Sequence, residues 1–512
     1  MSSYPRQRAL ADLRRSERGF TMATTALGLF VVTLLVLATV TAVNGDIHLS
    51  RTDLDHKQAY EAAKAGIDDY AFHLNSDNNY WTQCTSVPSP NAVNQQGSTA
   101  RRRAVPGGSG ATYAIELIPA TGKSSCDTAN PVASMIEPSG QMQGSFRIRS
   151  NGYAGNAHVS IVASFRRASF LDYMYFTQLE TSDPVTYGDP NTIAGAYQQC
   201  TLTYQQGRYN APIPNSGGQY CNKIAFISGD TVNGPLHSND SLGICGSPTF
   251  GRTSADSIEV SANPPGWFSI CSPATPNFVG TYVTKSPVLT PPPSNSQLAT
   301  ITQPAYRFSG QVYITLSGNS MTVTTQSGTV GPMAFPSNGV VYVSNASCSA
   351  TYSPFGTTYP GATGCGNAYV HGSYTGQLTI AAENDVVVDG DLTNSGGGMV
   401  GLIANNFVRV YHPCTNGTNG AGSLSNLRID AAILTINHSF IVDNYNCGAS
   451  LGNLTVNGAI AQKFRGPVGT FGSQNTGYLK NYVYDDRLRY VEPPNFIDPV
   501  QSAWVIGRET NG

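Results

Sequence analysis

The side chains with the greatest catalytic potential lie between His237 and Arg465 of this 512-residue chain. They are four histidines, four aspartates and two possible bases: His237, His371, His412, His438, Asp385, Asp389, Asp391, Asp443, Lys463 and Arg465. No spacing groups the two bases with the aspartates. Histidines and aspartates in turns at strand ends usually hydrogen-bond to the backbone. We therefore expect no catalytic residue, and keep a carbohydrate-active enzyme as the alternative.

Motifs for metals and nucleotides are missing from the sequence. Asp389-Gly390-Asp391 could contact calcium, but the further ligands of a calcium loop do not follow. The sequence contains no C-x-x-C pair, G-x-S-x-G, H-E-x-x-H or Walker-type glycine loop. We predict that the protein uses neither a metal nor a cofactor.

The charge of the chain gives no sign of a polyanionic partner. Charged residues make up 12% of the sequence, and the formal net charge is −2. Arg101-Arg102-Arg103 is an isolated basic triplet in a loop rich in serine and glycine, where we expect it to be solvated. Nucleic acid is therefore not an expected partner.

The N-terminal region joins a short basic leader to a long apolar segment. Arg14, Arg15 and Arg18 precede Gly19, and the run from Phe20 to Val43 contains no charged residue. Such a run is long enough to cross about 30 Å of hydrocarbon. The basic leader predicts a cytoplasmic N-terminus, which places the chain after Gly45 outside the cytoplasm. No secretory-type cleavage site follows the run, so we expect the apolar segment to be retained.

The junction Arg18-Gly19-Phe20-Thr21 resembles the leader of type IV prepilins. This resemblance implies cleavage between Gly19 and Phe20 by a prepilin peptidase, and N-methylation of Phe20. It also implies other pilin subunits as partners and contact with membrane lipid through residues 20–43. The family usually has glutamate at the fifth mature position, which is Thr24 here, so a minor pilin is implied. A plain single-pass anchor is the alternative.

Helical periodicity continues after the apolar segment. One apolar seam contains Leu54, Ala59, Ala63, Ile67, Tyr70 and Leu74. No proline lies between Pro5 and Pro88, so we predict an uninterrupted helix over residues 20–75. The stretch from Gln58 to Ile67 resembles the A-x-x-A-A-E-A-G signature of PilX-type N-terminal regions, with Lys64 where the signature has an acid. The resemblance covers about the first 75 residues and implies a pilin-like helix.

All ten cysteines follow the membrane segment, on the oxidising side. Their even number predicts disulfides, although sequence alone does not determine the connectivity. The simplest hypothesis joins sequential neighbours: Cys84–Cys126, Cys200–Cys221, Cys245–Cys271, Cys348–Cys365 and Cys414–Cys447.

The rest of the chain has the pattern of β-structure. Residues 76–168 are expected to form a small strand-rich pilin head, with Ser150-Asn151-Gly152 and Gly155-Asn156 as turns. In residues 169–477, short apolar runs such as Val386-Val387-Val388 repeatedly end at Asn, Asp or Gly. This pattern favours a parallel β-helix, with a β-sandwich as the alternative. Residues 478–512 are predicted to cap the last coil.

Two functions from different classes fit these features. The first is a minor pilin-like surface protein whose β ectodomain has a structural or adhesive role, with a glycan or protein surface as ligand. The second is a membrane-anchored β-helix enzyme acting on carbohydrate. A flat, tyrosine-rich, disulfide-linked surface favours the first. A cluster of acids with a basic partner in one groove favours the second.

Overall fold

The computed structural model describes residues 6–77, 80–84, 102–107, 110–137, 145–167, 169–202, 207–349, 352–356, 362–470, 472, 474–489, 491–500 and 504–511. The chain divides into two compact units. The first contains helix α1 (Arg6–Ser76), strands β1 to β4 and residues 506–511 of strand β32 (Trp504–Asn511). The second contains Arg167–Val505 and is mainly β-structure.

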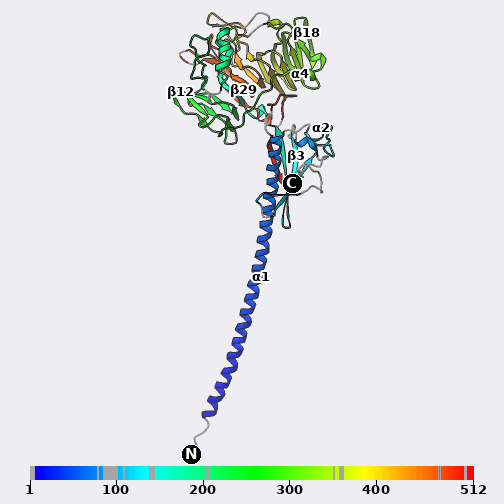
Figure 1. The fold of residues 1–512 in the computed structure, drawn as a ribbon, viewed down its shortest axis with the longest axis vertical. Coiled ribbons are helices and arrows are strands. Elements are labelled where there is room, and N and C mark those ends of the chain that lie inside the picture. The colour runs from blue at the N-terminus through cyan, green and yellow to red at the C-terminus, as the bar shows by residue number, and fades with distance from the viewer. Residues whose placement is uncertain are drawn as a thin grey trace, which may run out of the picture. The chain divides into compact units, whose positions relative to one another are not determined.

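Helix α1 is continuous, as expected from the absence of proline (Figure 1). Its stretch Met22–Thr41 is long and apolar enough to cross a membrane, with a mean hydropathy of 2.3, and none of it is buried in the protein. The hydroxyls of Thr25, Thr33, Thr39 and Thr41 donate to backbone carbonyls three or four residues earlier, at 2.5–3.0 Å. These bonds satisfy the hydroxyls inside the helix, as a lipid environment requires.

The sheet of the first unit has the strand order β1-β2-β3-β4-β32. Its first four strands are antiparallel: β1 (Arg103–Ala104), β2 (Thr112–Ile118), β3 (Phe146–Ala154) and β4 (Ala157–Arg167). Helix α1 packs against β2 and β3. Phe146, Ile148, Ile161, Ala163 and Phe165 alternate along β3 and β4 and are buried.

Two expectations for this unit are corrected. Leu54 is 53% exposed, whereas the other five residues of the predicted seam are buried. The seam therefore begins at Ala59. Ser150-Asn151-Gly152 lies inside β3 and is not a turn, whereas Gly155-Asn156 does connect β3 to β4. Gly152 has a packing role, since a Cβ there would lie 1.9 Å from the carbonyl oxygen of Ala59 on α1.

Most strands of the second unit belong to one mixed sheet in which parallel pairs predominate. Its longest parallel ladder contains, in spatial order, β15 (Arg307–Ser309), β19 (Val340–Ser344), β21 (Gln377–Ala382), β23 (Met399–Ala404), β27 (Arg428–Thr435), β29 (Ser450–Arg465), β5 (Tyr175–Ser182), β8 (Leu236–Ser238), β11 (Ser257–Val260) and β14 (Thr281–Thr284). Eight residues paired across it form one buried column: Val341, Ile380, Leu402, Ile433, Ile460, Tyr175, Leu236 and Ile258.

Two further parallel ladders accompany the first. One contains β16 (Val312–Gly318), β20 (Ala368–Tyr374), β22 (Val386–Asn394), β24 (Val408–Val410) and β28 (Phe440–Val442). The other joins β27, β29, β31 (Thr476–Tyr484), β7 (Thr231–Asn233), β10 (Thr249–Phe250) and β13 (Asn277–Phe278). Both ladders continue the aliphatic and aromatic core of this unit.

The spatial order of the ladders differs from the sequence order. The chain enters at β5, moves along the ladder to β14, and then restarts at the opposite end with β15. It winds back until β29 pairs with β5, so residues 460 and 175 become neighbours. Residues 285–306, which contain helix α4 (Ser296–Ile301) and the short helix η6 (Pro304–Tyr306), make the long connection.

The C-terminal segment is placed differently from the predicted cap. Strand β31 lies between β29 and β7, in the middle of a ladder and not at its end. After the short helix η8 (Asp486–Arg489), strand β32 joins β4 in the sheet of the first unit. Tyr490, part of the predicted cap, lies outside the described residues.

Candidate functional site

The predicted cleavage site lies within α1. The helix backbone continues through Gly19 and Phe20, whose side chains are outside the described set. Thr24 lies on the exposed stretch Met22–Thr41. Cleavage between Gly19 and Phe20 and methylation of Phe20 remain predictions.

The stretch that resembles the PilX-type signature has a packing role in the structure. Ala59, Ala62, Ala63 and Ile67 are buried. A Cβ on Gly66 would lie 2.3 Å from Ser150 Oγ on β3, so the helix and the sheet approach too closely for larger side chains there. Small residues in this stretch therefore set the distance between α1 and the sheet.

Lys64, the departure from this signature, lies away from the tightest part of the seam. It is half-buried, with its ammonium group 5.6 Å from the ring centre of Tyr60. This distance suits a cation–π contact. A positive charge at this position is therefore compatible with the packing of the helix.

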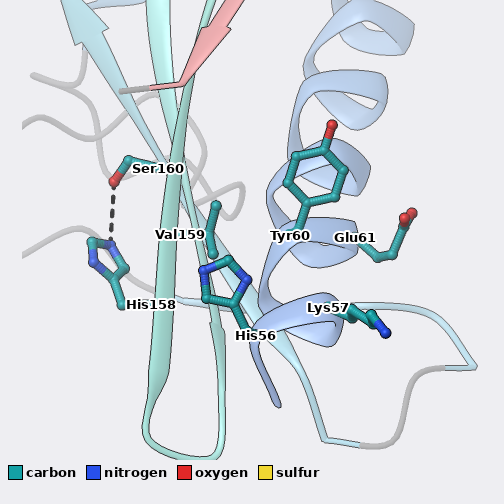
Figure 2. Close-up of a pocket in the computed structure, with 7 residues that line it drawn as sticks. All are labelled: His56, Lys57, Tyr60, Glu61, His158, Val159 and Ser160. Atoms are coloured by element: carbon teal, nitrogen blue, oxygen red, sulfur yellow. Dashed lines mark hydrogen bonds between the residues drawn. The ribbon is translucent and has the colours of Figure 1, made fainter. Parts of the chain in front are cut away.

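A surface pocket of about 570 Å³ lies between α1 and β4 (Figure 2). Its lining consists of His56, Lys57, Tyr60, Glu61, His158, Val159 and Ser160. Lys57 already pairs with Asp53 at 2.8 Å, and this hydrogen bond lowers the pKa of Asp53. His158 Nε2 lies 3.4 Å from Ser160 Oγ. Both signs of charge are present, so the lining does not select one charge class of ligand.

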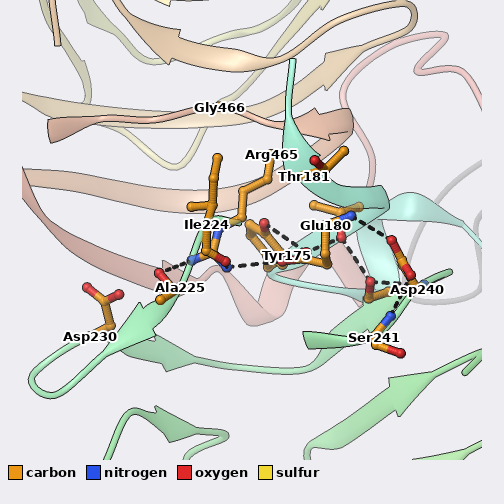
Figure 3. Close-up of polar contacts among 12 residues, drawn as sticks. Tyr175, Glu180, Thr181, Ile224, Ala225, Asp230, Asp240, Ser241, Arg465 and Gly466 are labelled. Carbon is orange, nitrogen blue, oxygen red and sulfur yellow. Dashed lines mark hydrogen bonds and ion pairs between the residues drawn. The ribbon is translucent and has the colours of Figure 1, made fainter. Parts of the chain in front are cut away.

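Arg465, one of the two possible bases, is buried in the second unit and not available to substrate (Figure 3). Its guanidinium group donates to Glu180 Oε2 at 3.0 Å and to the carbonyl oxygens of Ile224 and Ala225. Tyr175 donates to the other oxygen of Glu180 at 3.2 Å. The group is therefore a closed structural network.

Two other ion pairs lie in the same region of the second unit. Arg208 pairs with Asp240, and both side chains are fully buried. Lys480 donates to Asp230 at 2.9 Å, and burial lowers the pKa of Lys480. Glu180 and Asp230 belong to the early part of this unit, whereas Arg465 and Lys480 belong to its late part. The Glu180–Arg465 and Asp230–Lys480 pairs therefore join segments that meet only after folding.

Asp385 and Asp443, both catalytic candidates, are held by one buried arginine. Arg409 donates to Asp443 Oδ2 at 2.7 Å and to Asp385 Oδ2 at 3.3 Å, and Tyr352 also donates to Asp443. Burial raises the pKa of Asp443 to about 6. Because both carboxylates are fully buried, this cluster stabilises the fold and does not face a substrate.

Three of the four histidines are held in place by polar contacts with other residues of the fold. His237 lies between Glu259 and Asn239, at 3.2 and 3.1 Å. His412 contacts the Asp443 carbonyl and Asn419, at 2.9 and 3.1 Å. His438 contacts the carboxylate of Asp183 at 3.1 Å and stacks on Phe407, with 4.3 Å between ring centres.

His371 differs from these three because its side chain is 39% exposed. Its Nδ1 lies 2.9 Å from Asp389 Oδ1, and its Nε2 lies 3.3 Å from Thr315 Oγ1. The structure thus brings together two predicted candidates and a threonine that sequence reasoning did not select. These three residues form the most accessible polar cluster among the candidates.

The remaining candidates do not join a common site. Asp391 accepts a hydrogen bond from the backbone of Arg428. The backbone amide of Lys463 donates to the carbonyl of His438, and its ammonium group lies 5.7 Å from the ring centre of Phe464. Within the described ranges, no three His, Cys, Asp or Glu side chains are arranged to hold a metal ion.

The five disulfides connect the sequential neighbours that the simplest hypothesis joins. They are Cys84–Cys126, Cys200–Cys221, Cys245–Cys271, Cys348–Cys365 and Cys414–Cys447, with Cα–Cα distances of 4.2–6.2 Å. No cysteine is free. The disulfides therefore close local loops in both units.

The two described arginines of the basic triplet are solvent-accessible, as expected, and each also has a neighbour within the first unit. Arg102 lies 3.5 Å from the ring centre of Tyr153, and Arg103 pairs with Asp69 at 3.0 Å. Arg101 lies outside the described residues. Two of the three arginines are thus engaged within the first unit, which gives them a packing role.

Sequence reasoning did not identify the buried charged residues. Glu180, Arg208, Asp240 and Arg409 have no motif around them, and Glu180 and Arg465 are 285 residues apart. An isolated charge within an apolar strand, as at Arg409 in Val408-Arg409-Val410, is the available signal. That signal suggests a buried pair but does not identify the partner.

No known protein family matches the chain, and no curated protein matches it. Among solved structures, the chain is similar to the competence-associated pilin ComZ from Thermus thermophilus, with 13% identity over 89% of this chain and 96% of that chain, and a TM-score of 0.27. This TM-score does not establish a shared fold, so the functional proposal depends on the chain's own residues.

Proposed function

We propose that this chain is a minor, pilin-like subunit of a type IV pilus or a related surface assembly. The observation that carries the proposal is the division of α1 into two consecutive segments with different surroundings. Met22–Thr41 is apolar and exposed, whereas Ala59 to Leu74 pack on an antiparallel sheet. Such a helix needs lipid or neighbouring helices around its apolar N-terminal segment, whereas the sheet of its own head covers its C-terminal segment.

Processing and topology follow from this proposal. A prepilin peptidase removes residues 1–19 and leaves Phe20 as the methylated first residue. Residues 20–43 then lie in the membrane, with the preceding leader in the cytoplasm and the β-structure outside. The five disulfides support an exported location, because disulfides persist in oxidising compartments. Thr24 in place of glutamate favours a minor role.

For the large domain we propose a parallel β-helix over residues 169–477. The support comes from three parallel ladders and the buried column from Val341 to Ile258. Asparagines at successive turns add a polar ladder, since Asn406 donates to Asn384 and Asn384 donates to Asn367, both at 2.7 Å. Stacked aliphatic columns with turn ladders are what coil-on-coil stacking requires.

The domain scheme of the proposal keeps the predicted boundaries. Residues 1–19 are the leader, 20–75 the membrane and pilin-like helix, and 76–168 the head. The β-helix domain occupies 169–477, and 478–512 form the C-terminal segment. The division of the described residues into two compact units near Arg167 supports the boundary between head and β-helix.

We propose a structural or adhesive role without turnover for the β domain. The enzyme alternative needs accessible acids beside a basic partner. Asp385, Asp443 and Arg465 are instead buried in closed ion pairs. Other pilin subunits are the expected partners along α1, and a glycan or protein surface is the expected ligand of the ectodomain.

The processing step is tested with Gly19→Val in cells that carry the matching prepilin peptidase. Immunoblotting of membranes is expected to show an unprocessed, slower-migrating band for this variant. Gly28→Val is the matched control, because no atom lies within 4 Å of a Cβ at Gly28 and the residue lies beyond the cleavage site. Equal migration of wild type and Gly19→Val would contradict the proposal.

A further inference from the structure

An outer sheet face of the second unit combines hydroxyl groups, an exposed tyrosine and the His371 cluster. It consists of five adjacent strands, in the order β18 (Gly328–Ala334), β17 (Ser320–Thr325), β16, β20 and β22. Four strand spacings give the face a width of about 19 Å. On β16, Val312, Ile314 and Leu316 are buried, so Tyr313 and Thr315 face outward.

The first row across this face presents an aromatic ring. Thr329, Thr324, Tyr313 and Tyr369 are successive cross-strand neighbours. The ring of Tyr313 is 42% exposed and lies 4.6 Å from the Tyr369 ring, centre to centre. Gln311 donates to Tyr313 Oη at 2.6 Å. The exposed ring is therefore fixed by a second ring on the neighbouring strand and by an amide at its hydroxyl.

The second row presents hydrogen-bonding groups beside the ring. Thr322, Thr315 and His371 are successive neighbours. Asp389 joins them by contacting His371 Nδ1 at 2.9 Å. This row contains one imidazole, one carboxylate and otherwise hydroxyl groups.

A local irregularity of the sheet holds the second row in place. The register of β20 against β22 shifts between Val370 and Gly372, which leaves Asp389 beside His371. Gly372 has φ +120°, and a Cβ on Gly390 would lie 2.9 Å from His371 Cβ. Bulges of this kind often redirect side chains at binding sites. The alternative is an ordinary solvated strand face, for which neither a shifted register nor a supported exposed ring is needed.

We propose that this face binds an uncharged glycan chain, a proposal that rests on the surface role proposed for the ectodomain. The apolar face of a sugar ring stacks on Tyr313, as amphipathic rings do on aromatic side chains. Its hydroxyls exchange hydrogen bonds with Thr315, His371 and Asp389. An uncharged ligand fits because Asp389 is the single formally charged side chain of the two rows, and binding is therefore expected to depend weakly on salt.

The test uses the full chain in detergent micelles and measures binding isotherms for cellulose, chitin, xylan, dextran and amylose. At least one of these glycans is expected to bind the wild type. Tyr313→Ala is expected to weaken that binding about tenfold, whereas Tyr313→Phe, which keeps the ring, changes it little. His371→Ala is expected to weaken it by a similar factor. Tyr220→Ala is the control, because Tyr220 is 53% exposed and lies outside the two rows.

Three results would overturn the proposal: no binding to any of the five glycans, equal losses for Tyr313→Ala and Tyr220→Ala, or glycan cleavage. Cleavage abolished by His371→Ala would instead show that this cluster takes part in turnover. Each outcome is independent of N-terminal processing, so failure here is distinguishable from failure of the pilin-like assignment.

Discussion

The two units bury their internal surfaces in different ways. In the first, α1 approaches β3 through alanines and glycines, and Gly152 leaves no room for a side chain next to Ala59. In the second, the junction of β29 with β5 contains a buried ion pair between Arg465 and Glu180. The first interface requires small side chains, and the second requires two opposite charges to be paired.

This difference teaches how each interface obtains its specificity. A seam of small residues defines the distance between a helix and a sheet, and it is encoded within one short stretch. A buried ion pair distinguishes the correct partner from other strands with similar aliphatic patterns, because an unpaired charge in the interior is costly. The second unit needs this device because its late strands must dock on early strands across many similar edges.

The largest expected effect is at the charged junction. Arg465→Met leaves Glu180 buried without its cation, so we expect a loss of about 3–5 kcal/mol in the free energy of unfolding. The double variant Glu180→Met/Arg465→Met should be less destabilised than Arg465→Met alone. Denaturant titration of the full chain in detergent measures both.

A matched control separates burial from charge removal. Arg428 pairs with Asp430 at 2.8 Å, but its side chain is 52% exposed. Arg428→Met is therefore expected to cost less than about 1 kcal/mol. Similar losses for Arg465→Met and Arg428→Met would show that the buried pair is not what holds the junction.

The next effect concerns the seam of small residues. Gly152→Val places a side chain within 1.9 Å of the carbonyl oxygen of Ala59, and the backbone cannot yield easily. We expect a loss of about 3 kcal/mol, detected as earlier proteolysis of the first unit and a lower unfolding midpoint. Gly28→Ala, with nothing near its Cβ, should leave both readouts unchanged. An unaltered midpoint for Gly152→Val would mean that α1 does not pack as closely as described.

The smallest effect concerns an exposed charge pair in the second unit. Arg252 donates to Asp486 at 2.7 Å, and this hydrogen bond lowers the pKa of Asp486 below its ordinary 3.8. A carboxylate with a lowered pKa in the folded state contributes stability above its unfolded value and loses it as the pH falls through its folded value. Asp486→Asn should therefore cost less than about 1 kcal/mol at neutral pH.

The pH dependence of this difference is the check on its origin. The gap between wild type and Asp486→Asn should shrink as the pH falls from 3.8 through the lowered pKa of Asp486, because the aspartate is then uncharged like the asparagine that replaces it. Parallel denaturant titrations across the acidic range measure this gap. A constant gap would assign the effect to packing and not to charge.

Local features of this fold could be predicted from the sequence, and long-range ones could not. The helix over α1 and the seam from Ala59 to Leu74 follow from short spacings, and the disulfides match the simplest pairing of neighbouring cysteines. Leu54 was misplaced because periodicity does not show where a sheet begins to cover a helix. Gly152 was misread as a turn because glycine also marks close backbone approach.

The placement of charged residues depended on contacts that no short spacing reveals. Asp385 directly precedes β22 and Asp443 directly follows β28, so Arg409 on β24 closes the cluster only after the ladders form. The C-terminal segment likewise could not be placed, because β31 inserts between strands from the two halves of the domain. The His371 cluster became visible once β22 brought Asp389 beside β20.

The central claim is that α1 is a processed pilin-like helix, and the mass of the mature N-terminus tests it most directly. Protein is purified from membranes of a host with a prepilin peptidase, digested and analysed by mass spectrometry. The account predicts an N-terminal peptide that begins with N-methylated Phe20 and the absence of peptides from residues 1–19. Native protein that retains an intact Met1 would contradict the claim and leave α1 as a plain membrane anchor.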